Sequence, residues 1–124
     1  MKHGKHVILC VDDDRDILEA LQVVLEANHY SVVTAATAEA GFKAWKAEQP
    51  DLVIVDLMME EVDAGTSLVT RLKAQGNTAP VFLLSSVGDQ LDRSIDAGQL
   101  GLSGVFQKPI DSNALLNTIK QHLK

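Results

Sequence analysis

The chain alternates short strand-like segments with segments of helical spacing, and this alternation constrains its fold more than any other feature. The strand-like segments lie at 6–11, 30–36, 52–55, 81–84 and 104–109. The helical segments, whose apolar residues recur three or four apart, lie at 15–29, 37–49, 66–76, 89–100 and 112–123. Continuous apolar strands between helices favour a parallel sheet covered on both faces, and right-handed crossovers make it a doubly wound α/β sheet.

The composition is typical of a globular protein of one domain. The chain has 124 residues, of which 46% are hydrophobic and 23% charged. Its formal net charge of −6 argues against direct binding to nucleic acid or to an anionic membrane. No apolar stretch approaches the length of a membrane span, and the single cysteine, Cys10, lies in an apolar run, where we expect a buried thiol in a reducing compartment. We therefore expect a cytoplasmic protein.

Polar side chains gather where the strand-like segments end. In a doubly wound sheet, ligands bind beyond the carboxyl ends of the strands. The residues at these ends are Asp12, Asp13, Asp14, Asp56, Ser85, Ser86 and Lys108. The second segment ends in alanines and contributes no polar side chain. Taken singly, Asp14 is explained as a helix N-cap and Asp56 as a turn former, but the joint placement of the set favours a functional site.

Three carboxylates converge if the first and third strands are neighbours, since adjacent strands lie about 4.8 Å apart. Asp12, Asp13 and Asp56 then raise one another's pKa unless a cation lies among them. Lys108 offers an ammonium group, and Mg²⁺ suits a set of oxygen ligands. A hydroxyl group from Ser85 completes the set. An anionic phosphoryl group needs this combination of positive charge around its oxygens and an in-line carboxylate nucleophile.

Four motifs resemble those of a known family. In order along the chain they are ILCVDDD, PDLVIVDLMM, APVFLLSSVGD and VFQKP. Together they resemble the receiver domain of bacterial two-component response regulators, the CheY-like family, over essentially the whole chain. The resemblance implies a single doubly wound five-stranded parallel sheet in the order 2-1-3-4-5 with five helices. It also implies that 1–124 form one receiver domain, with no output domain in this chain.

The resemblance implies a role for each acidic residue at the strand ends. Asp56 is expected to accept a phosphoryl group. Asp13 is expected to bind Mg²⁺ directly, and Asp12 to position the metal largely through water. The carboxylate of Asp56 and the backbone carbonyl of Met58 are expected to be further metal ligands.

The resemblance also implies phosphoryl-binding residues and partners. Ser85 is expected to bond one phosphoryl oxygen and Lys108 another, while Ser86 matches a small residue that gives the phosphate access. The Lys108–Pro109 peptide bond is expected to be cis. The phosphoryl donor is expected to be a histidine kinase or a histidine phosphotransfer protein. Phosphorylation is then expected to shift the face of the fourth helix, fifth strand and fifth helix, which an unknown downstream partner or a second copy of the chain would bind.

The chain departs from the family pattern at several positions. Glu60 stands where the family has a proline and is followed by Glu61, and Ala64 lengthens the same turn. These glutamates form a solvated loop, or they tune metal affinity or kinase choice. Val105 occupies the switch position, normally Tyr or Phe, and period-two alternation directs Phe106 to the opposite face of the strand. The connection within 97–109 is longer than usual and rich in glycine.

Two apolar residues, Met58 and Val87, lie where the family tunes hydrolysis. Neither side chain can orient a water molecule by hydrogen bonding, so we expect self-catalysed phosphorylation followed by slow dephosphorylation. Two other functions stay open. One is a receiver-like interaction module that is never phosphorylated, and the other is a phosphatase with an aspartate nucleophile. Such phosphatases place a second aspartate two residues after the nucleophile, where this chain has Met58.

Overall fold

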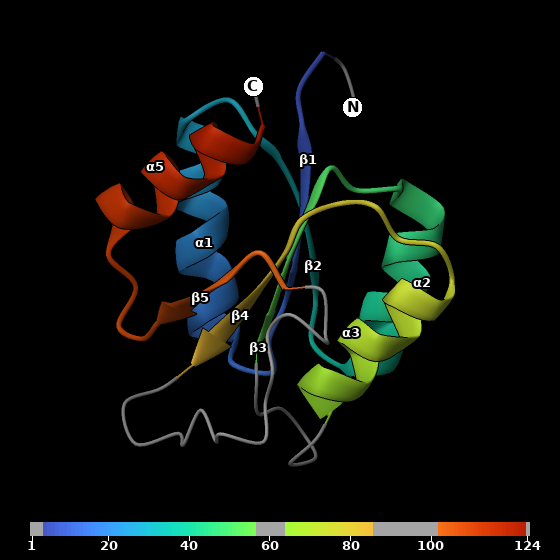
Figure 1. The fold of residues 1–124 in the computed structure, drawn as a ribbon. Coiled ribbons are helices and arrows are strands. Elements are labelled where there is room, and N and C mark those ends of the chain that lie inside the picture. The colour runs from blue at the N-terminus through green and yellow to red at the C-terminus, as the bar shows by residue number, and fades with distance from the viewer. Residues whose placement is uncertain (1–3, 57–63, 86–101, 124) are drawn as a thin grey trace.

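The computed structural model describes residues 4–56, 64–85 and 102–123, whose strands form one parallel sheet (Figure 1). The strands are β1 (Val7–Val11), β2 (Ser31–Ala35), β3 (Leu52–Asp56), β4 (Val81–Ser85) and β5 (Gly104–Gln107). Their order across the sheet is β2-β1-β3-β4-β5. This order confirms the predicted doubly wound sheet, and it places the carboxyl ends of β1 and β3 side by side.

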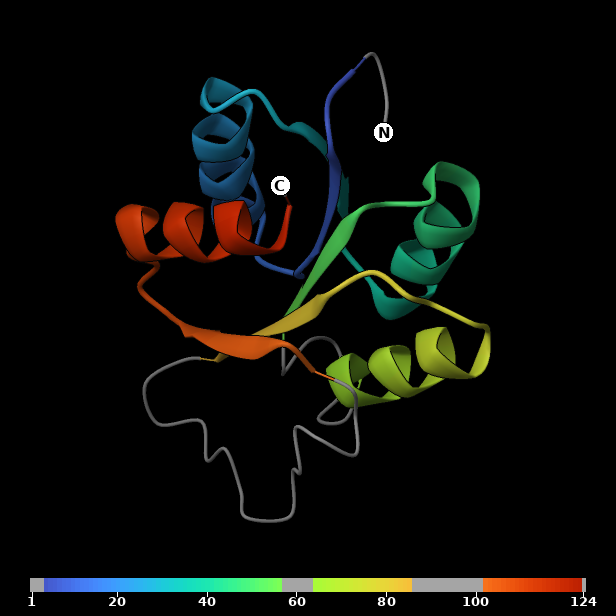
Figure 2. The same cartoon turned by 45° about the horizontal axis from the view of Figure 1, so that its top comes forward.

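Helices cover both faces of the sheet (Figures 1 and 2). The described residues form the helices α1 (Arg15–Ala27), α2 (Ala38–Glu48), α3 (Ala64–Ala74) and α5 (Ser112–His122). Figure 2 shows α1 and α5 on one side of the strands and α2 and α3 on the other. The predicted helix at 89–100 lies outside the described residues. No helix in the described ranges is long and apolar enough to cross a membrane.

The third helix is displaced from its prediction, since it begins and ends two residues earlier than the expected 66–76. The helix ends just before Gly76, whose backbone adopts a left-handed conformation with φ of +90°. The Gly76 amide donates to the Lys73 carbonyl at 3.1 Å, and the Asn77 amide donates to the Leu72 carbonyl at 3.0 Å. This pair of bonds is a Schellman-type cap, which glycine favours because it adopts positive φ without strain.

Side-chain caps begin three of the helices. Asp14 accepts a hydrogen bond from the Asp16 amide at 2.9 Å, which confirms its predicted N-cap role on α1. Thr37 likewise caps α2 by accepting from the Ala40 amide at 3.0 Å. Asp111 caps α5 through two backbone amides. Because Asp14 is used in this way, only Asp12 and Asp13 remain for chemistry after β1.

The core consists of two apolar layers, one on each face of the sheet. Every residue of β1, β3 and β4 is buried, as expected for parallel strands between helices. Ile8 and Cys10 pack with α1 and α5, whereas Leu9 and Val11 pack with α2 and α3. Burial, with a smaller contribution from the charge of Asp12, raises the pKa of the Cys10 thiol to about 12. The thiol is therefore protonated and unreactive, as predicted for a buried cysteine.

Gly41 allows α2 to approach β1 closely. A Cβ at this position would lie 2.9 Å from Val11 Cγ2 and 3.2 Å from Leu68 Cδ2. We expect Gly41→Ala to lower the free energy of unfolding by about 1–2 kcal/mol, because overpacking outweighs the better helix propensity of alanine. Urea unfolding measures the change, and Ala47→Ser on the exposed side of α2 is the control. Equal or greater stability of Gly41→Ala would show that Val11 and Leu68 adjust without cost.

Candidate functional site

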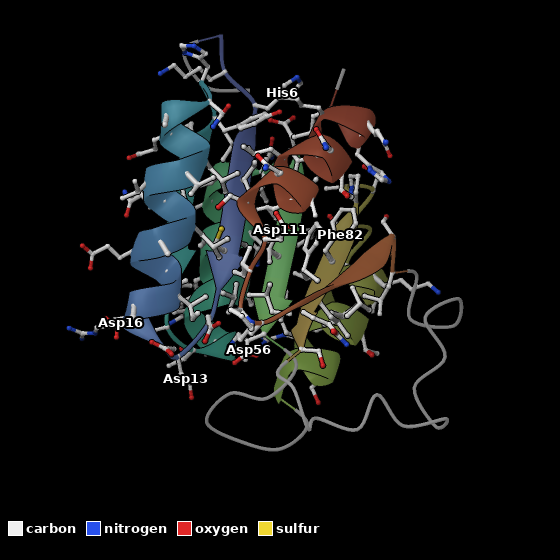
Figure 3. All side chains as sticks on the ribbon, turned by 90° about the vertical axis from the view of Figure 1, so that its left-hand side faces the viewer. His6, Asp13, Asp16, Asp56, Phe82 and Asp111 are labelled. Atoms are coloured by element: carbon white, nitrogen blue, oxygen red, sulfur yellow. The ribbon has the colours of Figure 1, made fainter. Side chains whose placement is uncertain are left out.

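Three carboxylates meet where β1 and β3 end. β1 pairs with β3 up to Val11 opposite Val55, so the residues that follow are neighbours. Asp12 is fully buried, Asp56 is 3% exposed, and Asp13 is exposed. One carboxylate oxygen from each of the three lies within 4.8 Å of the others. Figure 3 shows Asp13 and Asp56 at the same end of the sheet. The structure thus brings together the acidic residues that the strand ends predicted.

Backbone contacts hold Asp12 in place. Its amide donates to the Ala35 carbonyl of β2 at 3.0 Å, and its Oδ1 accepts from the Asp14 amide at 2.9 Å. The second strand therefore contributes to the site through its backbone, although its side chains gave no polar signal. No pattern of side chains could have revealed this contact, because any residue supplies the same carbonyl.

Lys108 reaches into the carboxylate cluster from the end of β5. Its Nζ lies 2.9 Å from Asp12 Oδ2 and 3.4 Å from Asp56 Oδ1. Its backbone amide donates to the Ser85 carbonyl at 2.7 Å, which joins the ends of β4 and β5. The Lys108–Pro109 peptide bond is cis. The lysine thus forms its shorter ion pair with Asp12, and it bridges two of the three carboxylates.

The environment shifts the pKa values of two of these groups. Burial, then the negative charge of Asp12, raises the pKa of Asp56 to about 6, although the ammonium group of Lys108 opposes both effects. For Lys108, burial disfavours the charged form, but the hydrogen bonds and charges of Asp12 and Asp56 outweigh it and raise the pKa. Near neutral pH the site therefore contains an ionised Asp56 and a charged lysine.

The donor atoms suit a hard divalent cation. All three carboxylates offer oxygen ligands, and Asp13 is exposed and accessible from solvent. Mg²⁺ binds oxygen ligands and is commonly held by one or two carboxylates together with water, so the cluster fits this ion in the chemistry of its donor atoms. A bound divalent ion would also offset the repulsion between Asp12 and Asp56.

The other residues singled out in the sequence lie in different places. Ser85 ends β4 and is 1% exposed, so it lies at the same edge of the sheet as Asp56. Val105 is 37% exposed on β5, whereas Phe106 is directed to the other face and stacks on Phe82 with ring centroids 4.9 Å apart. This confirms the predicted alternation at the switch position. Several candidates lie outside the described residues, namely Met58, Glu60, Glu61, Ser86 and Val87.

Comparisons with known proteins agree with this geometry. The family model for the response regulator receiver domain matches residues 8–120. The chain is 36% identical over 124 residues to the transcriptional regulatory protein GlrR of Escherichia coli K12, covering all of this chain and 28% of the relative. It is 30% identical over 117 residues to the alkaline phosphatase synthesis transcriptional regulatory protein PhoP of Bacillus subtilis, covering 94% of this chain and 48% of the relative. The chain thus spans less than half the length of either relative.

Solved structures of response regulator proteins are also similar to this chain. A CheY-like receiver domain protein from Methanospirillum hungatei has a TM-score of 0.86 at 27% identity, with 95% of this chain and 93% of that chain covered. A putative response regulator from Chloroflexus aurantiacus has a TM-score of 0.83 at 29% identity, with 97% and 98% covered. Each match covers nearly all of this chain and nearly all of the other chain. The chain belongs to the response regulator receiver family.

Proposed function

We propose that this receiver domain accepts a phosphoryl group on Asp56 in a Mg²⁺-dependent reaction. The single observation that carries the proposal is the position of Asp56, which is nearly buried at the end of β3 between two further carboxylates and the Lys108 ammonium group. Mg²⁺ would be held by Asp12, Asp13 and Asp56, with the backbone carbonyl of Met58 as a further ligand. The donor would be a histidine kinase or a histidine phosphotransfer protein, which are the partners that the family implies.

The reaction is a transfer between a nitrogen and an oxygen atom. A carboxylate oxygen of Asp56 attacks the phosphorus of a phosphohistidine, the P–N bond breaks, and its electron pair stays on the imidazole nitrogen, which then takes up a proton. Ionised Asp56 is the reactive form, and its pKa of about 6 keeps it ionised at neutral pH. Lys108 would pair with a phosphoryl oxygen and Ser85 would donate a hydrogen bond to another. Bound Mg²⁺ would neutralise further negative charge on the phosphoryl oxygens.

The product would change the contacts of Lys108 and so the strand that carries it. A phosphoryl group adds about two negative charges and three acceptor oxygens. We propose that it draws Lys108 away from Asp12, which now holds the lysine at 2.9 Å. Through β5 this would alter the face formed with α5 and the helix predicted at 89–100. A downstream protein or a second copy of the chain would bind that face, and we expect the reaction to take place in the cytoplasm.

The phosphorylated state should persist. The side chains of Met58 and Val87 offer no hydrogen bond to an attacking water, so we expect slow hydrolysis without a partner phosphatase. The fraction of phosphorylated protein, followed by intact mass after removal of the phosphodonor, measures the rate. Loss within seconds would show that another group orients the water.

The proposal is tested by intact mass spectrometry after incubation with a small acyl phosphate. Wild-type protein should gain one phosphoryl group with Mg²⁺ and none with a chelator, because the metal offsets the charge of the acceptor site. Asp56→Asn should gain none. The control is Asp16→Asn, an exposed change on α1 outside the carboxylate cluster, which should behave as wild type. No gain on the wild type would favour an interaction module that is never phosphorylated.

A further inference from the structure

Three aromatic rings pack against one another on the side of the sheet that α5 covers. Phe106 of β5 stacks on Phe82 of β4 with ring centroids 4.9 Å apart and an angle of 25° between the ring planes. Phe82 in turn meets His122, in the last turn of α5, edge to face at 5.1 Å and 89°. Both arrangements are favourable geometries for aromatic pairs. We call these three residues the aromatic stack.

The aromatic stack joins the interior of the domain to its surface. Phe82 is 1% exposed, Phe106 is half-buried and His122 is exposed. His122 lines a hollow together with His6, which directly precedes β1. Figure 3 shows His6 and Asp56 at opposite edges of the sheet. The aromatic stack therefore reaches from β5 to the edge of the sheet that is remote from the carboxylate cluster.

The Phe82 ring supports β5 directly. A Cβ on Gly104 would lie 3.0 Å from Phe82 Cε1 and 3.2 Å from Phe82 Cδ1, so the glycine leaves the space that the ring fills. Phe106 covers the same ring two residues further along the strand. β5 lies at the edge of the sheet, and among the strands of the described residues it pairs only with β4. Backbone pairing with β4 and contact with the Phe82 ring are therefore two interactions that hold β5 in position.

Lys108 is close to the aromatic stack along the chain. It follows Phe106 by two residues, and its Nζ lies 2.9 Å from Asp12 Oδ2. A phosphoryl group on Asp56 would draw Lys108 away from Asp12, and a displacement of β5 would carry Phe106 with it. Because interiors are close-packed, a displaced Phe106 ring changes its contact with Phe82 and passes the strain to the next side chain.

We propose that the aromatic stack carries the change at Lys108 to the last turn of α5 when Asp56 is phosphorylated. This proposal rests on the phosphorylation proposed above. Val105 presents no ring to the outer face of β5, so the inward stack would take the place of the aromatic side chain expected at that position. The exposed ring of His122 would be displaced, and a partner that contacts this surface would distinguish the two states of the domain.

His122 is a direct reporter of the aromatic stack. Because a carbonyl only accepts hydrogen bonds, the Nδ1–H of His122 donates to the Thr118 carbonyl at 3.0 Å, which limits rotation of the imidazole. The ring current of Phe82 shifts the nuclear magnetic resonance signals of the His122 ring protons according to the relative position of the two rings. These signals, recorded at constant pH, therefore measure the displacement. His29, exposed after the end of α1, is the internal control.

The first test compares wild type with Phe106→Leu, before and after treatment with an acyl phosphate and Mg²⁺. Intact mass of the same samples gives the phosphorylated fraction, so that signals are compared at equal phosphorylation. In wild type the His122 signals should move and those of His29 should not. In Phe106→Leu the displacement of the His122 signals should fall to about half or less, because the ring that contacts Phe82 is gone. Phe106→Tyr keeps a ring and should restore the displacement.

Two further variants separate the coupling from general packing and from phosphorylation itself. Val32→Ala removes part of a half-buried side chain from the same apolar layer on β2, at the other edge of the sheet, and should leave the displacement unchanged. Lys108→Ala should itself move the His122 signals without any phosphoryl group, and less so when combined with Phe106→Leu. If Phe106→Leu fails to fold by circular dichroism, Phe106→Met replaces it with the same expected loss.

Three results would overturn the proposal. They are unmoved His122 signals in phosphorylated wild type, the full displacement in Phe106→Leu, which would assign the coupling to the backbone of β5 alone, and an equal displacement of the His29 signals. No mass gain on the wild type would instead refute phosphorylation of Asp56. Lys108→Ala then decides the coupling, and unmoved His122 signals in that variant would overturn it.

Discussion

Lys108→Ala should slow phosphoryl transfer to Asp56 by about a hundredfold or more, because it removes a positive group placed to neutralise a phosphoryl oxygen. The same variant should bind Mg²⁺ more tightly than wild type. In the structure the Lys108 ammonium group lies 2.9 Å from Asp12 and 3.4 Å from Asp56, so it occupies the electrostatic position that a metal ion would share. Slower phosphoryl transfer and tighter Mg²⁺ binding are thus expected from one change.

Two measurements check this prediction. The initial rate of mass gain with an acyl phosphate gives the effect on transfer, and isothermal titration calorimetry gives the Mg²⁺ affinity. Lys120→Ala on the exposed surface of α5 is the matched control and should leave both unchanged. Lys108→Ala leaves the buried carboxylate of Asp12 without its ion pair. The rates of both variants are therefore measured at saturating Mg²⁺. A rate within a few fold of wild type would show that Lys108 is a structural counter-ion only.

Asp56→Asn should stabilise the protein in the presence of a chelator at a pH above 6. The folded-state pKa of Asp56 is raised from 3.8 to about 6, so folded protein holds this proton more tightly than unfolded protein does. The ionised carboxylate therefore lowers the free energy of unfolding. This effect is fully present above the folded-state pKa and is absent below the unfolded-state pKa. The difference between the two pKa values corresponds to about 3 kcal/mol, and we expect a gain of about 2–3 kcal/mol for the neutral amide.

The pH dependence separates this effect from general packing. Urea unfolding with a chelator should show a gain from Asp56→Asn that is full at about pH 8 and falls toward zero at about pH 4, as Asp56 of the wild type becomes protonated. Adding Mg²⁺ at the higher pH should narrow the gap, because binding stabilises the folded wild type preferentially. Asp16→Asn, an exposed change, should show neither trend. Equal stability of Asp56→Asn and wild type at both pH values would contradict the raised pKa.

The sequence was sufficient to predict the sheet and the carboxylate cluster. Leu52–Asp56 is a short apolar run that ends in a carboxylate, and such a run between two helical segments favours a strand covered on both faces. Parallel strands end at a common edge, so neighbouring strands place Asp12 and Asp56 together whatever the details of the loops. The N-cap role of Asp14 was predictable from its position, since a short polar side chain directly before a helical segment accepts hydrogen bonds from free backbone amides.

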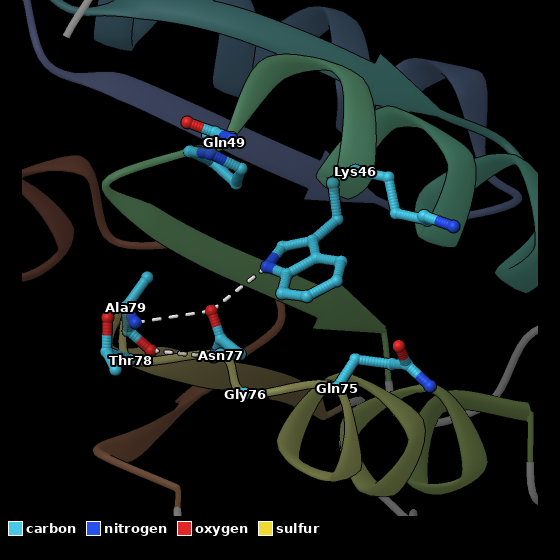
Figure 4. Close-up of a pocket in the computed structure, with 9 residues that line it drawn as sticks. Lys46, Gln49, Gln75, Gly76, Asn77, Thr78 and Ala79 are labelled. Atoms are coloured by element: carbon cyan, nitrogen blue, oxygen red, sulfur yellow. Dashed lines mark hydrogen bonds between the residues drawn. The ribbon is translucent and has the colours of Figure 1, made fainter.

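Other features of the site and the fold depend on three-dimensional geometry that a sequence pattern does not specify. The shorter ion pair of Lys108 is with Asp12 and not with Asp56, which depends on the side-chain rotamer and on the path of the chain after β5. The Ala35 carbonyl contributes through a backbone atom that every residue has. Trp45 packs on Phe42 with ring centroids 5.9 Å apart. Its hydrogen bond to Asn77, which is 32 residues away, joins the end of α2 to the segment after α3 (Figure 4), and no local spacing predicts that contact.

The most direct test of the central claim is to identify the residue that carries the phosphoryl group. Protein treated with an acyl phosphate and Mg²⁺ is reduced with borohydride, which converts an aspartyl phosphate to homoserine, and is then digested and sequenced by tandem mass spectrometry. The expected result is homoserine at position 56 alone, and none when a chelator replaces Mg²⁺. Reduction at Asp12 or Asp13 instead, or modification that persists without divalent metal, would contradict the assignment of Asp56 as the acceptor in a metal-dependent site.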